Sequence, residues 1–379
     1  MTIPVERRFS KDYGEARRTF LHAAGIAGAG LREYPYDIAG PVGERLTTDV
    51  AWLGDRDAVN VQVLMSGTHG VELYSGSACM TDVLLRHPLP RGWAICCIHA
   101  VNPWGAAWGR RENEENIDLN RNYVDFGSAL PRNDLYREIH ADLLLKDLSD
   151  SALEASNAGI ARAVERHGAR AVLTARSAGQ YEFPDGMHYG GTKPTASRLI
   201  IERIIQEFDL AGRDNLVVWD YHTGAGPFGY CEPIYLGLPH GTRYGIAKTI
   251  FGSWLTAQQT DLAVTPPQTG LGSELWERLC GDRTSFIALE FGTYPMTASG
   301  GILRQDNFLH RHGELHQLAQ QNTRQIKDRL REEYDPQCPL WRQLVLSQNT
   351  IIFNLFRSHA AKPGSSRRFQ ERNCINDNS

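Results

Sequence analysis

The segment Asn60-Val-Gln-Val-Leu-Met-Ser-Gly-Thr-His-Gly-Val-Glu72 decides the fold that this sequence predicts. Its first half is a short apolar run, which is typical of a buried strand. Its second half is a glycine-containing turn that presents His69 and Glu72 three positions apart. An imidazole and a carboxylate at this spacing suit two ligands of one metal ion. The segment therefore predicts a strand whose carboxyl end carries half of a metal site.

Similar apolar runs recur along the chain, with helix-like segments between them. We expect strands at residues 59–65, 93–101, 171–173, 216–221, 233–238 and 285–291. We expect helices at residues 9–28, 135–143, 195–208 and 242–251, and a long late helix over residues 315–330 that ends before Pro336. This alternation predicts an α/β fold, a single-domain three-layer α/β/α architecture with a mixed, mainly parallel twisted sheet.

Length and composition narrow the class of protein. The chain has 379 residues, of which 41% are hydrophobic and 22% charged, as in soluble globular proteins. We expect one catalytic domain over residues 1–357 and a polar, mobile tail over residues 358–379. The net charge of -4 gives no support for nucleic acid as a partner, and no apolar run approaches the roughly 18 residues of a membrane span. Seven cysteines without a Cys-x-x-Cys pair, and no signal peptide, favour a cytoplasmic location.

Further chemically distinctive residues fall just after the apolar runs. In parallel sheets, ligands bind beyond the carboxyl ends of the strands. His222 ends one run and precedes a glycine turn, so it is the candidate for a third metal ligand. Asn120 and Arg121 form an amide–guanidinium pair that suits a carboxylate ligand. Glu290 lies near the end of another run, where partial desolvation raises a carboxyl pKa and favours proton transfer.

Together these segments resemble the zinc carboxypeptidase superfamily. The shared pattern is His-x-x-Glu after a strand, an Asp-x-Asn-Arg-Asn segment, a strand-end His and a strand-end Glu. This sequence has all four in that order, and the resemblance spans about residues 40 to 300. Residues 179–191 and 220–229 resemble one bacterial branch of the superfamily, a domain of unknown function (DUF2817).

The resemblance implies a site for one zinc ion. His69, Glu72 and His222 would hold the ion, and Asp118 would accept the other ring N–H of His69. Glu290 would take a proton from a water molecule activated by the zinc and pass it to the leaving nitrogen. The implied activity is hydrolysis.

The resemblance also implies how a substrate is held. Asn120 and Arg121 would bind its carboxylate, and Arg111 would stabilise the developing oxyanion. The superfamily usually carries a tyrosine on a mobile loop shortly before the catalytic glutamate. This chain has no tyrosine at residues 245–289, and Tyr294 is the candidate substitute.

Side-chain preference in the superfamily depends on a segment that corresponds to residues 244–273, part of which we interpret as a loop. Glu274 follows this segment. It either selects the charge of the substrate or stabilises the N-terminus of a helix through the helix dipole, and we favour the second interpretation.

Three functions are consistent with these residues. The leading hypothesis is a zinc hydrolase that cleaves an amide bond next to a free carboxylate, as carboxypeptidases do. The alternative is an N-acyl amino acid deacylase of the aspartoacylase or succinylglutamate desuccinylase type, since those enzymes share the His-x-x-Glu, the later His, the Asn-Arg pair and the Glu. The third is a non-catalytic binding module on the same fold. The expected partner is a small peptide or an N-acyl amino acid, and the sequence does not indicate an oligomeric state.

Overall fold

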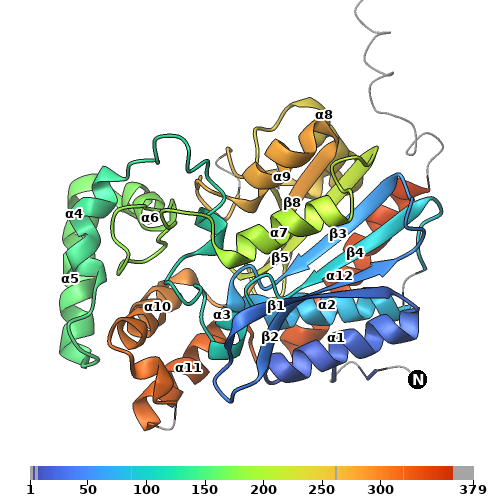
Figure 1. Ribbon diagram of the computed structural model, residues 1–379. Coiled ribbons are helices and arrows are strands. Elements are labelled where there is room, and N and C mark those ends of the chain that lie inside the picture. Colours follow the sequence, from blue (N-terminus) through green and yellow to red (C-terminus); the bar gives the residue numbers. More distant parts are fainter. Residues whose placement is uncertain (1–2, 5–6, 87, 261–262, 319, 362–379) are drawn as a thin grey trace, which may run out of the picture.

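An eight-stranded sheet forms the centre of the protein. The computed structural model describes residues 3–4, 7–86, 88–260, 263–318 and 320–361. The strand order is β1-β2-β4-β3-β5-β8-β6-β7 (Figure 1). The strands are β1 (Gly30–Ala39), β2 (Arg45–Leu53), β3 (Asn60–Ser66), β4 (Trp93–His99), β5 (Asn215–Gly224), β6 (Cys231–Tyr235), β7 (Thr256–Ala257) and β8 (Thr284–Gly292).

The central strands are parallel and the flanking pairs are mostly antiparallel. Strands β4, β3, β5 and β8 run in one direction, whereas β2 pairs antiparallel with β4, and β6 pairs antiparallel with β8. The register places Ser66 of β3 beside Tyr221 of β5, and His222 of β5 beside Glu290 of β8. The carboxyl ends of β3, β5 and β8 therefore lie side by side, and the predicted mixed, mainly parallel α/β sheet is confirmed.

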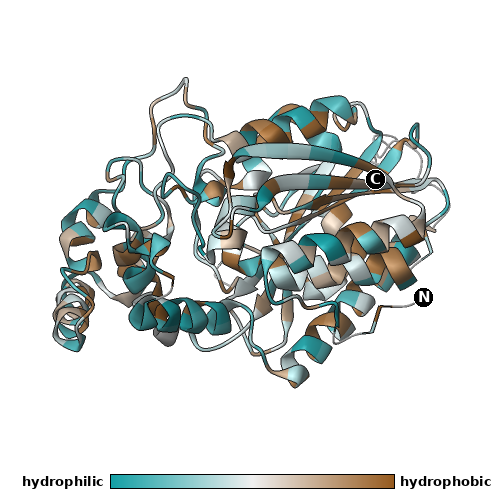
Figure 2. Ribbon diagram, turned by 60° about the horizontal axis from the view of Figure 1, so that its bottom comes forward, coloured by the Kyte–Doolittle hydropathy of each residue, from teal (hydrophilic) through white to brown (hydrophobic). Residues whose placement is uncertain are grey.

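Helices cover both faces of the sheet. One buried cluster joins the strands to α1 (Tyr13–Ala27), α2 (Leu73–Arg86), α8 (Gly241–Phe251) and α12 (Pro339–Ala360). On the opposite face, a second cluster joins the strands to α7 (Ala196–Glu207) and α9 (Gly272–Cys280). In Figure 2 the flanking helices show alternating hydrophobic and hydrophilic bands, as expected for helices with one buried side.

A further group of helices lies beyond the carboxyl ends of the central strands, at the left of Figure 1. These helices share a third buried cluster. They are α3 (Pro103–Trp108), α4 (Asp134–Leu143), α5 (Asp150–His167), α6 (Ala169–Ser177), α10 (Met296–Arg311) and α11 (Gln321–Tyr334). Among the described residues, no helix combines the length and the apolar character that crossing a membrane requires.

The strand predicted at residues 171–173 is wrong, because these residues lie inside helix α6. The three apolar residues are part of a helical pattern, in which Val172 and Ala175 are buried three positions apart. The strands β1, β2 and β7 were not predicted. Strand β1 is mostly exposed and contains Pro35, so it lacks the continuous apolar run of a central strand.

The C-terminal region also differs from the prediction. The late helix α11 begins only at Gln321, and Leu315 belongs to a separate short 3₁₀ helix, Glu314–His316. Helix α12 continues to Ala360, so the predicted domain boundary at residue 357 falls inside a helix. Residues 362–379, most of the predicted tail, lie outside the described residues.

Candidate metal centre

The turn that carries His69 and Glu72 is fixed by close packing against its neighbours. A Cβ atom added to Gly70 would lie 2.1 Å from the carbonyl carbon of Gly105, so only glycine fits there. The Gly70 N–H donates to the carbonyl of Arg111 at 3.2 Å. The backbone of the turn is therefore tied to the polar segment that supplies the arginine side chains of the site.

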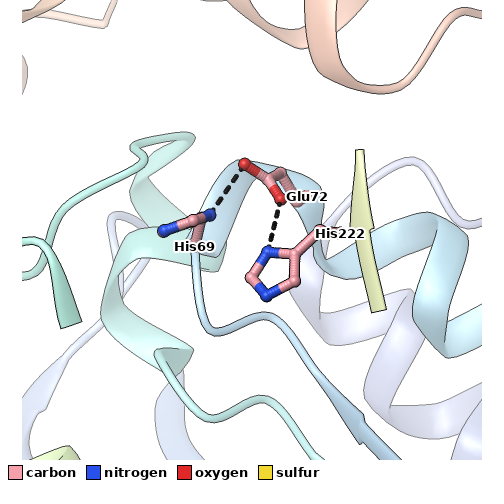
Figure 3. A group of neighbouring side chains, drawn as sticks. All are labelled: His69, Glu72 and His222. Atoms are coloured by element: carbon pink, nitrogen blue, oxygen red, sulfur yellow. Dashed lines mark hydrogen bonds and ion pairs between the residues drawn. The ribbon is translucent and has the colours of Figure 1, made fainter. Parts of the chain in front are cut away.

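The two histidines meet the two oxygens of one carboxylate, as Figure 3 shows. His69 Nδ1 lies 2.9 Å from Glu72 Oε1, and His222 Nδ1 lies 3.2 Å from Glu72 Oε2. The candidate ligand atoms of the three residues lie within 4.8 Å of one another, and all three side chains are buried. The structure thus brings together the residues that the sequence predicted as metal ligands.

Each ring is oriented by a second carboxylate at its outer nitrogen. His69 Nε2 lies 3.2 Å from Asp118 Oδ1, and His222 Nε2 lies 2.9 Å from Asp220 Oδ2. The Thr68 hydroxyl donates to Asp220 at 2.9 Å. When Nδ1 of each ring binds a metal, Nε2 carries the proton and can donate to these carboxylates. Two imidazoles and one carboxylate oriented in this way fit a catalytic zinc site.

Sequence reasoning missed Asp220, although a signal was present. Side chains two positions apart on a strand lie on the same face, and Asp220 precedes His222 by two positions in β5. An Asp-x-His pair at the end of a strand therefore predicts a carboxylate behind the histidine.

Arg111 lies against the candidate ligands. Its Nη1 donates to Glu72 Oε1 at 3.0 Å, and its Nη2 lies 2.8 Å from His69 Nε2 and 3.3 Å from Asp118 Oδ2. The guanidinium of Arg111 thus lies against the His69 ring and against the carboxylates of Glu72 and Asp118.

The charges of the centre compensate one another. Burial raises the pKa of Glu72, but the opposing influence of His69, His222 and Arg111 outweighs burial and holds the pKa below its usual value. Burial lowers the pKa of His222, yet the carboxylates of Asp220 and Glu72 outweigh burial and raise the pKa well above 6.5. Glu72 is thus ionised and available as a ligand.

Glu290 differs from Glu72 in its pKa, because neighbouring groups oppose the effect of burial less strongly at Glu290. It lies on β8 beside His222, and its Oε1 accepts the N–H of Ala225 at 2.9 Å. Burial and the charge of Glu72 raise the pKa of Glu290 to about 7. A carboxyl group with such a pKa can accept and return a proton near neutral pH.

A cavity of about 430 Å³ opens onto this centre. Strands β6 and β8 contribute Ile234 and Ala288 to its lining, and Leu236 follows β6 directly. The loop after β7 contributes Gln258, Thr265, Pro266 and Gln268. Helices α6, α10 and α11 form another part of the lining, through Ala169, Leu173, Arg176, Ser177, Gly300, Leu303 and Tyr334.

Asn120 and Arg121 both line the cavity. The amide oxygen of Asn120 accepts the N–H of Gly272 at 2.8 Å, which directs its oxygen away from a ligand and leaves its NH₂ group as a donor. The Arg121 guanidinium donates to the Ser177 carbonyl at 3.0 and 2.6 Å and to the Asn120 carbonyl at 2.6 Å. These bonds hold the guanidinium in one orientation, and binding of a substrate carboxylate by this pair stays a prediction.

Glu274 stabilises a helix end, as we favoured from the sequence. It lies in the first turn of α9, and its Oε1 accepts the N–H groups of Gly270 at 2.6 Å and Leu271 at 3.1 Å. Such bonds satisfy backbone donors that the start of a helix leaves free.

The tyrosine at the site is Tyr334, which the sequence reasoning missed. Tyr294 instead donates its hydroxyl to Glu332 at 2.7 Å and is not part of the cavity lining. Tyr334 lines the cavity, and a Cβ added to Gly224 would lie 3.0 Å from its Cε1 and 4.0 Å from Glu290 Oε1. Burial raises the pKa of Tyr334, so its hydroxyl stays protonated and can donate. Only its spacing from Leu330 marked it in the sequence, and that spacing predicts a buried helix face rather than a site.

One protein family matches most of the chain. The model of the family described as Protein of unknown function (DUF2817) matches residues 9–348. No curated protein matches the chain.

Several solved structures are remotely similar to this one. Bovine thrombin-activatable fibrinolysis inhibitor has 12% identity and a TM-score of 0.44, with 86% of this chain and 98% of that chain covered. Carboxypeptidase A from Helicoverpa armigera has 12% identity and a TM-score of 0.43, with 84% and 73% covered. A metallo-carboxypeptidase from Pseudomonas aeruginosa has 12% identity and a TM-score of 0.41, with 80% and 69% covered.

Proposed function

We propose that this chain, which belongs to the DUF2817 family, is a zinc-dependent hydrolase that cleaves an amide bond next to a free carboxylate. The observation that carries the proposal is the group of His69, Glu72 and His222 beside a buried Glu290 whose pKa is raised to about 7. The three candidate ligands and the candidate proton acceptor lie at or just after the ends of strands β3, β5 and β8, and all four line one cavity. A carboxyl group whose pKa is raised by burial and by a neighbouring charge, and that lines a cavity, is a candidate functional group.

In the proposed reaction, different residues of the chain hold the metal and orient its ligands. His69, Glu72 and His222 would hold the zinc, while Asp118 and Asp220 keep the imidazole rings oriented. When bound, zinc supplies a Lewis acid that polarises the scissile carbonyl and lowers the pKa of water.

Glu290 and Arg111 would act on the reacting groups. Glu290 takes a proton from the attacking water and delivers it to the leaving nitrogen, which its near-neutral pKa permits. Arg111 and the protonated hydroxyl of Tyr334 are donors at the cavity wall, placed to stabilise negative charge that develops on the carbonyl oxygen. Asn120 and Arg121 would position the substrate through its carboxylate.

Hydrolysis of blocked dipeptides, followed with and without a strong chelator, tests the proposal. We expect activity that is lost on chelation, restored by zinc, and accompanied by one zinc ion per chain in metal analysis. Activity that survives complete removal of zinc would contradict the proposal.

Deacylation of N-acyl amino acids is the second candidate function. The observation in its favour is that helices α6, α10 and α11 form part of the wall of the cavity, whose volume of about 430 Å³ lies within the usual range of small-molecule sites. Relative rates on N-acyl amino acids and on peptides of increasing length separate the two functions. The cysteines that the structure describes are unpaired, which agrees with the cytoplasmic location that we propose for either activity.

A further inference from the structure

Residues 179–191 form a loop between α6 and α7 that polar side chains of other segments hold in place. The Asn116 NH₂ group donates to the Gly186 carbonyl at 2.9 Å. The Tyr136 hydroxyl accepts the N–H of Met187 at 2.7 Å. The backbone of this loop is therefore fixed directly before His188.

The backbone of His188 has an uncommon conformation. Its φ is +52°, in the left-handed region that favours glycine. The Gln180 N–H donates to the His188 carbonyl at 3.2 Å, and the Asp118 N–H donates to the carbonyl of the next residue, Tyr189, at 2.8 Å. Residues with a Cβ keep such a conformation only when their surroundings hold them there, and they are frequent at functional sites.

The side chain of His188 presents a neutral acceptor to the cavity. Its Nδ1 lies 3.1 Å from Asp118 Oδ2. Burial raises the pKa of Asp118, but the charges of Arg111 and Arg121 outweigh burial and hold the pKa well below its usual value, so Nδ1 donates to an ionised carboxylate. Burial lowers the pKa of His188 to about 4, which leaves Nε2 without a proton. Among the described residues Nε2 has no hydrogen-bond partner, and the side chain lines the cavity.

Cationic donors lie around this acceptor. Arg111 Nη2 lies 3.3 Å from Asp118 Oδ2, the same oxygen that His188 contacts. Arg176 of α6 also lines the cavity and has no hydrogen-bond or ion-pair partner among the described residues. A Cβ added to Gly300 would lie 2.7 Å from Arg176 Nη2, so this guanidinium packs against the backbone of α10. His188 thus adds an acceptor for substrate N–H groups to a wall that otherwise suits anions and carbonyl oxygens.

The neighbours of His188 indicate which part of the substrate it meets. In the proposed function, Arg111 faces the oxygen of the scissile carbonyl, and Glu290 delivers a proton to the leaving nitrogen. Glu290 lies on β8 beside His222, whereas His188 and Arg111 meet at Asp118. A bare Nε2 cannot bond to the carbonyl oxygen that Arg111 faces. Its partner is therefore a donor near this carbonyl, on the side away from the leaving nitrogen.

We propose that His188 is a substrate-binding residue whose Nε2 accepts a hydrogen bond from an N–H group in the acyl half of the substrate. This inference rests on the proposed function. An aminoacyl group carries such an N–H on the carbon atom next to the scissile carbonyl, whereas a simple acyl group has none there. His188 is then the residue that favours aminoacyl amides over simple acyl amides.

Matched substrates test the inference. The N-acetylglycyl derivative of an amino acid carries the N–H, and the 4-oxopentanoyl derivative of the same amino acid replaces it with a methylene group in a chain of the same length. We expect the protein to prefer the acetylglycyl compound by about 3- to 10-fold in kcat/KM, the range of one neutral hydrogen bond. The His188→Asn variant should reduce this ratio to about 1. An equal ratio in both proteins would overturn the inference.

The choice of variants separates contact with the substrate from support of Asp118. Asparagine tolerates the left-handed backbone, and its NH₂ group can still donate to Asp118, so His188→Asn should keep its zinc content. His188→Gly relieves the backbone and should also give a ratio of about 1, with thermal unfolding as the check on its fold. Rates that fall equally on both substrates would mean that His188 acts only through Asp118, which would overturn the inference. His310→Asn is the control and should keep the preference, because the His310 ring contacts the Glu114 carbonyl at 3.1 Å and does not line the cavity.

Binding of the two acyl products gives a readout that needs no turnover. N-acetylglycine and 4-oxopentanoate have the same chain length and charge, and differ in the N–H group. In calorimetric titrations of the zinc-loaded Glu290→Gln variant, N-acetylglycine should bind about 3- to 10-fold more tightly, and adding His188→Asn should make the two affinities equal. Equal affinities before that change, or an unchanged difference after it, would overturn the inference. If no amide is hydrolysed by any variant, the proposed function fails, while these titrations still decide the role of His188.

Discussion

The metal centre and the helical wall of the cavity differ in how their charged side chains are paired. We define the helical wall as Leu173 and Arg176 of α6 with Gly300 and Leu303 of α10. In the centre, each buried histidine faces carboxylates on both sides. In the wall, Arg176 has no carboxylate partner among the described residues. The difference is that the described residues of the centre balance one another's charges, whereas the wall presents an unpaired cation to the cavity.

The two regions are also built on different elements. The residues of the centre lie at the ends of strands that pair with one another, with His222 beside Glu290 in the register. The wall comes from two helices that meet across a glycine. We therefore expect changes in the centre to affect turnover and metal binding, and changes in the wall to affect the choice and affinity of substrates. The following predictions rank from the largest expected effect to the smallest.

Glu290→Gln should have the largest effect. The amide cannot accept a proton, so kcat should fall about 10²- to 10⁴-fold, the usual contribution of a general base. Zinc content should be unchanged, because Glu290 is not among the three candidate ligands. Steady-state kinetics and metal analysis of the same preparation measure both quantities.

Glu232→Gln is the control for this change. Glu232 is also buried and lies beside Glu290 in the strand register, but its carboxylate accepts from Thr256 at 2.6 Å and does not line the cavity. Its turnover should stay near that of the unchanged protein. Similar losses in the two variants would mean that any buried carboxyl group on these strands matters, and that Glu290 has no special role.

More residues of the metal centre than of the helical wall could be predicted from the sequence. His69, His222 and Glu290 each follow or end an apolar run, and parallel strands bring such positions to one edge of the sheet. Arg176 could not be predicted in the same way. Its helix was interpreted as a strand, and its significance depends on Gly300, more than 120 residues later in the chain. The place of Tyr334 in the site could not be predicted either, because only the packing of α11 brings this residue to the cavity.

Asp220→Asn should weaken zinc binding by about 10- to 100-fold, as expected when a metal-binding histidine loses the carboxylate behind it. Asp118→Asn should act in the same way through His69. Competition titrations against a chromophoric chelator measure the change. Arg176→Gln is the control from the wall, and its zinc affinity should be unchanged. A loss of zinc affinity in that variant would remove the distinction between the two regions.

Tyr334→Phe should lower kcat/KM by about 5- to 30-fold, because one hydrogen bond to a partly charged group is lost. The described residues offer its hydroxyl no hydrogen-bond partner, so the melting temperature should hardly change. Tyr294→Phe is the matched control. That variant loses a bond to Glu332 outside the cavity and should keep its turnover. Equal activity of the two variants would show that the phenol of Tyr334 does not act on the substrate.

Leu173→Ala should have the smallest effect and tests the wall alone. Leu173 lines the cavity on the same helix as Arg176 but is 37% exposed, so its truncation removes only part of an apolar contact. We expect KM to rise about two- to fivefold with kcat unchanged, which is the signature of binding energy shared by the ground state and the transition state. Leu199→Ala on α7, an exposed leucine away from the cavity, is the control. A fall in kcat for Leu173→Ala alone would mean that the wall contributes to the transition state, and the division between chemistry and recognition would then have to be abandoned.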